Sequence, residues 1–388
     1  MAEERLAHID ALRGLALAGI ALVHFADGFA AGPLPPAPSD ALSSALMQVV
    51  ESFISNKAYA LFAFLFGFSF YLQMSAYGRR ERHPDLRYAW RLVLLLLLGV
   101  LHGLFWLGDI LLIFALLGFG LMALRRADDE VLLPLAFALV LNLPGICWDI
   151  VAAVADLPPL PELFDPHAYL RVLQHGSLAE LLRFHLEAQP AKLAFQVGSG
   201  RLAMTFGMFA LGLWVARNGW LQAPQQYRHG LRTAALAGLL GQLAMLAVAI
   251  VFHMLAAAFQ WHSPLSALVF GLFGSVHTLG MVTIYVAGLT LLMAQPHWHA
   301  RLAWLLPAGR MSLSVYLAQT VCGLLLFYGI GLGLVQKTPQ ALNLLLGALC
   351  FGALAWASRW WLARYRYGPL EWAWRSATAL RPLPLKLS

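Results

Sequence analysis

Three side chains on the first apolar segment, RLAHIDALRGLALAGIALVHF, could do chemistry: Asp10, Arg13 and His24. Placing a charge at the centre of a bilayer costs about 2.5 to 3.5 kcal/mol even on the lenient insertion scale, so such residues are usually paired or functional. On a helix that rises about 1.5 Å per residue, Arg13 and His24 lie roughly 16 Å apart. The segment therefore offers a fixed positive charge and, about half a bilayer away, an imidazole that can accept a proton.

Further polar residues are predicted at the depth of His24, in the outer third of the membrane. They are Lys57, His102, Asp109 and Arg201. His24 or His102 could serve as a general base, and Asp109 could orient it. Lys57 or Arg201 could bind an acceptor or stabilise an oxyanion. Two simpler interpretations stay open: both cations could reach for the interface, and Asp109 could cap a helix.

A second polar set is predicted near the inner face of the membrane. Its members are Arg13, Arg310, Ser312, Tyr316 and Gln319. Arg13 and Arg310 could bind the phosphates of a donor, and Tyr316 and Gln319 could contact a substrate. Asp10 and Arg13 lie one helical turn apart, so an ion pair that stabilises the helix start is the simplest interpretation of these two residues.

No metal site or tightly bound cofactor is expected. The three cysteines, Cys147, Cys322 and Cys350, lie in apolar runs without the spacing of a zinc site. The HWH run at 297–299 has no carboxylate or cysteine near it. The formal net charge is +7, but the basic residues fall in short loops between apolar segments, where they set topology. Nucleic acid is therefore excluded as a partner.

The elements that must position these residues are membrane helices. The chain has 388 residues, of which 60% are hydrophobic and only 12% charged. Its mean hydropathy is +0.70. A soluble domain has about a quarter charged residues and cannot hide this much apolar surface. We therefore expect an all-α, polytopic integral membrane bundle in contact with the lipid bilayer, formed by residues 1–388 as a single transmembrane domain.

Apolar stretches predict about ten transmembrane helices. They fall near 11–31, 57–76, 88–107, 110–124, 131–155, 200–217, 233–257, 265–293, 311–333 and 340–362. The third and fourth stretches are predicted to form a tight hairpin, and residues 40–54 an amphipathic interfacial segment. Residues 156–192 are predicted to form a long hydrophilic extracytoplasmic loop. Residues 363–388, with Trp372 and Trp374 among arginines, are predicted to form a cytoplasmic interfacial tail.

The distribution of basic residues predicts the orientation of the bundle. With the amino terminus inside, 20 of the 26 Lys and Arg residues fall on the inner side. Because cytoplasmic loops carry an excess of Lys and Arg, both termini are predicted to be cytoplasmic.

Four stretches resemble the YeiB family of bacterial inner-membrane proteins, which is grouped as a domain of unknown function. They are RLAHIDALRGLALAGIALVHF at the start, GVLHGLFWLGDILLIFALLG in the predicted hairpin, GRMSLSVYLAQTVCGLLLFYGIGLGL at 309–334 and GPLEWAWRS at 368–376. The resemblance covers essentially the whole chain. It implies a multi-pass protein of the bacterial inner, cytoplasmic membrane.

More distantly, the chain resembles a superfamily of transmembrane acyltransferases that modify sugars and glycans. Asp10, Arg13 and Gly14 match the D-x-x-R-G opening of its first helix. In the bacterial acyltransferase-3 branch, a catalytic histidine closes that helix at the spacing of His24. Members of the YeiB family usually carry asparagine there, so His24 departs from the nearer family. The histidine that follows this helix in the lysosomal glucosaminide acetyltransferase branch has no counterpart in this chain.

The leading hypothesis is a transmembrane acyl- or acetyltransferase. It would move an acyl group from a cytoplasmic donor such as acetyl-CoA to an extracytoplasmic or membrane acceptor, which could be a small molecule, a glycan or a lipid. The alternative is a permease or exporter of a small polar or anionic metabolite. A third hypothesis is a non-catalytic scaffold in which the polar residues serve helix packing. A homo-oligomer is compatible with all three.

Overall fold

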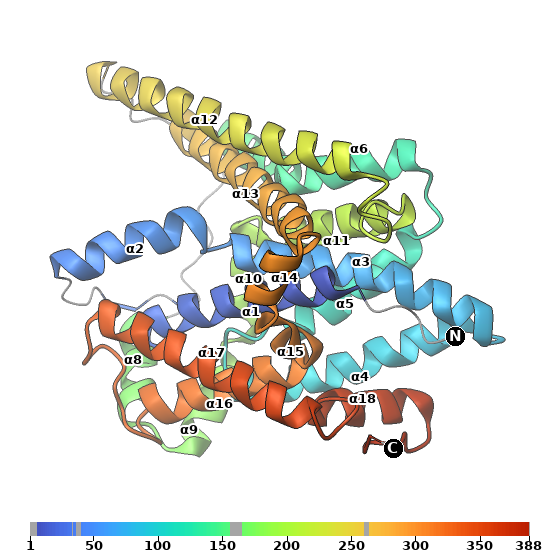
Figure 1. Ribbon diagram of the computed structural model, residues 1–388. Helices are drawn as coiled ribbons and strands as arrows, with labels where there is room; N and C mark the ends of the chain where they lie inside the picture. Colours follow the sequence, from blue (N-terminus) through green and yellow to red (C-terminus); the bar gives the residue numbers. More distant parts are fainter. Residues whose placement is uncertain (1–5, 33, 36–39, 156–164, 260–263, 388) are drawn as a thin grey trace.

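The computed structural model describes residues 6–32, 34–35, 40–155, 165–259 and 264–387. Throughout these ranges the secondary structure is helical, apart from turns and one isolated β-bridge between Tyr365 and Lys386 (Figure 1). The expected all-α class is therefore confirmed.

Each of the ten predicted spans corresponds to helix, but not all of these helices are long and straight. Six candidate spans contain α1 (Ala7–Ala26), α3 (Lys57–Arg80), α4 (Pro84–Phe105), α12 (Arg228–Phe259), α13 (Pro264–Met293) and α17 (Gln340–Leu362). Two further candidates are bent pairs, α6 (Asp129–Val140) with α7 (Leu143–Val154) at 54°, and α10 (Gln189–Gly198) with α11 (Arg201–Arg217) at 66°. The described residues thus form a multi-pass membrane protein with six to eight candidate spans.

Two apolar helices are too short to count among those spans. They are α5 (Leu111–Leu124) and α16 (Ser312–Phe327). Fourteen residues of helix reach about 21 Å, less than the roughly 30 Å of hydrocarbon. The amino terminus of α5 therefore lies within the bundle rather than at its surface. The total of ten spans, like the cytoplasmic location of both termini, stays a prediction.

The predicted hydrophilic loop at 156–192 is largely helical where it is described, and residues 156–164 lie outside the described residues. It contains α8 (Pro166–His175), α9 (Leu178–Glu187) and the first residues of α10. The Asp165 side chain caps α8 by accepting the His167 N–H, and Ser177 with Glu180 forms a capping box on α9. Backbone and side-chain hydrogen bonds from Ser177 lower the pKa of Glu180. Caps and prolines resemble loop residues in sequence, but here they begin helices.

Helix α9 is fastened to the end of α4 by His185. Its Nδ1 donates to the carbonyl oxygen of Leu104 at 2.9 Å, and the side chain is fully buried. Burial lowers the pKa of His185 to about 4, so the ring is neutral near pH 7. This contact holds the α9–α10 segment against the end of the bundle where α4 and α5 meet.

A close helix crossing joins α3 and α11, and it depends on two glycines. A Cβ added at Gly67 would lie 2.0 Å from the carbonyl oxygen of Phe209, and one at Gly212 would lie 2.0 Å from that of Phe64. Neither helix can move away from such an added methyl group without displacing other helices, because each is packed on several neighbours. This crossing fixes the distance between α3 and α11, which both carry residues of the site described below.

We expect Gly67→Ala to destabilise the protein by about 1 to 3 kcal/mol, the usual cost of overpacking a core. Gly78→Ala, on the same helix but with nothing within 4 Å of the added methyl group, is the matched control and should be neutral. Thermal unfolding of both variants in detergent measures the difference. Equal midpoints for the two variants would contradict this account of the crossing.

The carboxyl-terminal helix α18 (Pro369–Ala379) packs against the first half of α4, at the bottom right of Figure 1. Trp374 Nε1 donates to the carbonyl oxygen of Arg91 at 3.3 Å. Glu371 caps α16 by accepting the N–H groups of Leu313 at 2.7 Å and Ser314 at 3.1 Å. The predicted tail is therefore a docked helix, and it lies at the same end of the bundle as the start of α1.

Candidate functional site

Two cavities lie along α1, and their linings share no residue among the described parts of the chain. The larger one, here the His24 cavity, has a volume of about 770 Å³ and is lined by α1, α2 (Ala41–Phe53), α3, α10 and α11 together with residues 107–110. The smaller one, here the Arg13 cavity, has a volume of about 160 Å³. One helix therefore presents a polar residue to each cavity, as its spacing predicts.

His24 lies in the last turn of α1 and lines the larger cavity. Its ring packs edge-on against Trp106, with the centroids 4.5 Å apart, and Trp106 is itself held by a hydrogen bond from Nε1 to the Phe29 carbonyl oxygen. No hydrogen bond joins the His24 imidazole to another described residue. A neutral imidazole facing a cavity without a protein partner is free to take a proton from a bound molecule.

Two cations lie with His24 in the same lining, Arg201 at the start of α11 and Lys192 on α10. The Arg201 guanidinium carbon lies 4.9 Å from the ring centroid of Tyr59, whose hydroxyl is 2.7 Å from Thr205 Oγ1. The Lys192 ammonium is buried, makes no hydrogen bond to a described residue and lies 3.9 Å from Asp109 Oδ2. Both cations could therefore bind an anion or a developing oxyanion.

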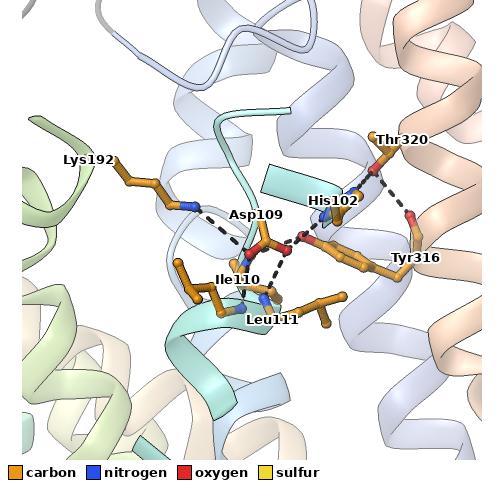
Figure 2. A network of polar contacts seen from close by, with 8 residues as sticks. His102, Asp109, Ile110, Leu111, Lys192, Tyr316 and Thr320 are labelled. Atoms are coloured by element: carbon orange, nitrogen blue, oxygen red, sulfur yellow. Dashed lines mark hydrogen bonds and ion pairs between the residues drawn. The ribbon is translucent and has the colours of Figure 1, made fainter. Parts of the chain in front are cut away.

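Beneath the His24 cavity, Asp109 is the centre of a buried network (Figure 2). Its Oδ1 accepts from His102 Nδ1 at 2.7 Å and from the Leu111 N–H at 3.1 Å. Its Oδ2 accepts from the Leu112 N–H at 3.0 Å. Because α5 begins inside the bundle, its first N–H groups need protein acceptors, and Asp109 supplies them. Both expected roles of Asp109, helix cap and partner of His102, are present together.

His102 is not available as a base in this arrangement. Nδ1 donates to Asp109, and Nε2 lies 3.0 Å from Thr320 Oγ1, so both ring nitrogens are engaged. With Asp109 ionised, Nδ1 carries the proton and Nε2 accepts from the Thr320 hydroxyl. His102 is absent from the lining of either cavity. The geometry therefore joins α4 to α16 through His102 and leaves His24 as the accessible imidazole.

Lys57 contributes to the turn before α3 rather than to the cavity surface. Its Nζ donates to the backbone oxygen of Glu51 at 2.5 Å, and the side chain is buried. Glu51 itself lines the His24 cavity, as does Asp27 just after α1. This wall of the cavity is therefore acidic.

The Arg13 cavity is rich in arginine. Arg13, Arg91, Arg310 and Arg375 line it together with Ser312 and Tyr316. The expected ion pair is present, since Arg13 NH1 lies 3.0 Å from Asp10 Oδ1, and its NH2 donates to Ser69 Oγ at 2.6 Å. Among the described residues of this lining, Glu371 is the one carboxylate, and it is occupied in capping α16, while Asp10 outside the lining pairs with Arg13. The excess of positive charge suits an anionic group.

Gln319 was predicted in the same set but lies elsewhere. Its Nε2 donates to the Leu17 carbonyl oxygen at 3.3 Å, and the residue is 2% exposed. It lines neither cavity. Tyr316 lines the Arg13 cavity and also contacts the Asp109 network. Its hydroxyl oxygen accepts the N–H of Ile110.

The layer between the cavities is about one helical turn thick. Tyr59 lines one cavity and Phe62 the other, three residues apart on α3, and the neighbouring residues Ile110 and Leu111 divide in the same way. Phe114 packs against both α3 aromatics, with ring centroids 5.9 Å apart in each case. An aromatic layer therefore separates the two cavities.

Several residues that line the His24 cavity are not among the site residues predicted from the sequence. They are Asp27, Glu51, Tyr59, Lys192 and Gln196. Lys192 and Gln196 lie four residues apart, the spacing that puts two side chains on one helix face, but the segment was expected to be a loop. Among the residues that the structure describes, no group of three or more His, Cys, Asp or Glu could hold a metal ion.

Comparison with known proteins links each half of the chain to a protein family. Residues 5–143 match the family described as heparan-alpha-glucosaminide N-acetyltransferase, catalytic, and residues 215–381 match the protein family of unknown function DUF418. The first match contains His24, His102 and Asp109. No solved structure matches the chain.

Three curated relatives align over almost the whole chain. Uncharacterized protein YxaH of Bacillus subtilis (strain 168) is 28% identical, covering 99% of this chain and 97% of its own length. Uncharacterized protein YeiB of Escherichia coli (strain K12) is 27% identical, covering 97% and 96%. An uncharacterized 39.9 kDa protein of Bacillus acidopullulyticus is 25% identical, covering 99% and 97%. The predicted resemblance is thus confirmed: this chain is a relative of YeiB with a DUF418 region, and it is distantly similar to transmembrane acyltransferases.

Proposed function

We propose that the protein is a transmembrane acyltransferase that uses His24 as its general base. One observation carries the proposal: the His24 imidazole faces a cavity of about 770 Å³ with no described hydrogen-bond partner. The His102 imidazole, by contrast, is committed to Asp109 and Thr320. Residues 5–143, which are similar to an N-acetyltransferase catalytic domain, include α1, and this similarity supports placing the active site at α1.

The proposed step transfers an acyl group from a thioester to a hydroxyl or amine. His24 removes the proton of the acceptor as its oxygen or nitrogen attacks the thioester carbonyl, and a new ester or amide bond forms. Arg201 and Lys192 stabilise the oxyanion. As the carbon–sulfur bond breaks, the imidazolium of His24 returns the proton to the leaving thiolate. The products are the acylated acceptor and a free thiol.

The donor, in this proposal an acyl-CoA such as acetyl-CoA, binds at the Arg13 cavity through its phosphates. The cavity, at about 160 Å³, is smaller than a whole coenzyme A, so the arginines would hold only part of the donor. The acyl end must then pass the aromatic layer of Tyr59, Phe62 and Phe114 to reach His24. Because Tyr59 and Phe62 are one turn apart, this passage is short.

We expect Arg310→Gln to raise the KM for acetyl-CoA about tenfold with little change in kcat, because a charge-assisted hydrogen bond contributes roughly 1.5 to 3 kcal/mol. Arg381→Gln, in the exposed tail, is the matched control and should leave both constants unchanged. The assay follows thiol release by the purified protein. A KM that is equal in the two variants would argue against donor binding at this cavity.

The permease remains the second candidate, and the pair of cavities favours it specifically. Two cavities at opposite ends of α1, separated by a layer one turn thick, also suit a carrier that opens to each side in turn. Purified protein in detergent distinguishes the candidates. Release of thiol from acetyl-CoA supports the acyltransferase, whereas uptake of a solute into vesicles that depends on a proton gradient, without thiol release, supports the permease.

A further inference from the structure

We infer that the acceptor is a membrane amphiphile with a phosphate headgroup, which enters the His24 cavity from the lipid between α2 and α10. The inference rests on the proposed function for the chemistry at His24 but goes beyond it by naming the acceptor class. Three features of the cavity carry it: two apolar helices at its mouth, an apolar wall and a cationic end.

Helix α2 lies at the left edge of the bundle in Figure 1. It exposes an apolar stripe. The stripe consists of Leu42, Leu46, Val49 and Phe53, which are 62%, 36%, 53% and 53% exposed. Their spacing of four, three and four residues places them on one face. An amphipathic helix of this kind lies in the membrane interface with its apolar face in the acyl chains. The end of α2 continues into the cavity lining through Glu51 and Ile54.

Helix α10 forms the other side of the mouth and has the same character. Leu193, Phe195 and Val197 are 50%, 56% and 57% exposed, whereas Lys192 and Gln196 are buried and line the cavity. Phe195 is exposed and also lines the cavity. The cavity therefore opens to the surface beside Phe195. A mouth bordered by exposed apolar side chains in a membrane protein faces hydrocarbon, and a molecule that enters there has an apolar portion.

The wall inside this mouth is apolar as well. It includes Ile20, Val23, Ile54, Ala58, Leu107 and Ile110. An acyl chain can rest against such side chains without leaving a polar group unpaired, whereas a wholly polar metabolite cannot. The wall therefore accepts the tail of an amphiphile and leaves its headgroup to the polar residues deeper in the cavity.

The cationic end has two groups with unused hydrogen-bond donors. The Lys192 side chain is 7% exposed, its ammonium has no hydrogen-bond partner among the described residues, and Arg201 Nε lacks one too. Asp109, the carboxylate nearest to Lys192, already accepts three hydrogen bonds. A phosphate on the cavity side would accept one hydrogen bond from Lys192 Nζ and one from Arg201 Nε, which is the pairing that buried cations require, and the other N–H donors of both cations would remain for the oxyanion. Asp27, just after α1, and Glu51, on α2, supply carboxylates to the same lining.

Binding to the purified full chain in detergent tests the inference without any acyl donor. The probe is dioctanoyl phosphatidic acid, and dioctanoylglycerol and inorganic phosphate test its two halves. Calorimetry should show phosphatidic acid binding at least tenfold more tightly than either. Dioctanoylglycerol binding as tightly would overturn the phosphate assignment, and inorganic phosphate binding as tightly would overturn entry from the lipid.

Variants locate the site and guard against misfolding. Lys192→Gln and Arg201→Gln should each weaken phosphatidic acid binding about tenfold, and Lys192→Arg should restore most of it. Lys337→Gln, an exposed lysine near the end of α16, is the matched control and should bind as the wild type does. Unchanged affinity in folded Lys192→Gln and Arg201→Gln would overturn the inference.

The inference and the proposed function fail in different ways. His24→Ala removes the base but neither cation, so it should bind phosphatidic acid while losing acyl transfer. Binding of phosphatidic acid to a wild type that releases no thiol would remove the proposed enzyme and keep the lipid site. Acyl transfer to a soluble acceptor by a wild type that does not bind phosphatidic acid would keep the enzyme and remove the lipid site.

Discussion

His24→Ala should reduce acyl transfer about 10²- to 10⁴-fold, the usual contribution of a positioned general base. The imidazole borders the cavity, packs edge-on against Trp106 and has no described hydrogen-bond partner, so its loss should cost little stability. Thiol release from acetyl-CoA in the presence of acceptor measures the effect, and thermal unfolding shows that the variant is folded. His299→Ala, on the exposed segment α14 (Pro296–Leu302), is the matched control.

His24→Asn sharpens the same test, because asparagine is the residue that the YeiB resemblance implies at this position. Asparagine keeps a polar side chain of similar size but cannot act as a base at neutral pH. We expect this variant to be as inactive as His24→Ala. Full activity in His24→Asn would show that the position needs only a polar group, and the mechanism through a base at His24 would be wrong.

Asp109→Ala should lower the free energy of unfolding by about 3 to 5 kcal/mol, the cost of removing one partner from a buried charged pair. The substitution leaves the Lys192 ammonium without its carboxylate and His102 Nδ1 without its acceptor. It also leaves the N–H groups of Leu111 and Leu112 unpaired inside the bundle. Chemical or thermal unfolding in detergent measures the loss.

Two companion variants separate the causes of that loss. Asp128→Ala is the control, because Asp128 is exposed at the start of α6 and its side chain makes no capping hydrogen bond there. Asp109→Asn combined with Lys192→Met should recover part of the stability, since no unpaired charge remains buried. A loss for Asp109→Ala no greater than that for Asp128→Ala would contradict the central place given to the Asp109 network.

Separations along a helix axis could be predicted from the sequence because a helix rises by a fixed amount per residue. His24 and Arg13 occupy separate cavities on one helix, as their separation of eleven residues requires. The Asp10–Arg13 pair follows from its spacing in the same way. The positions around each helix were harder to predict, because lipid is as apolar as the interior and a membrane helix carries little contrast between its faces.

Lys192 and Gln319 show the consequence of that missing contrast. Lys192 lies in a segment whose prolines and charges indicate a loop, yet the segment folds back as α9 and α10 and brings the ammonium to Asp109. Gln319 shares the depth of Tyr316, but it faces α1 and bonds to Leu17 instead of lining a cavity. Contacts between residues far apart in the sequence decided both cases.

The sequence by itself determined that this is a helical membrane protein similar to YeiB and that Asp10, Arg13 and His24 share one helix. Composition and helical rise suffice for these conclusions, since both are local properties. The tertiary structure decided which imidazole is accessible. It engages both nitrogens of His102 with Asp109 and Thr320 and leaves His24 facing a cavity with Lys192 and Arg201. That choice depends on helix packing across distances that no local pattern encodes.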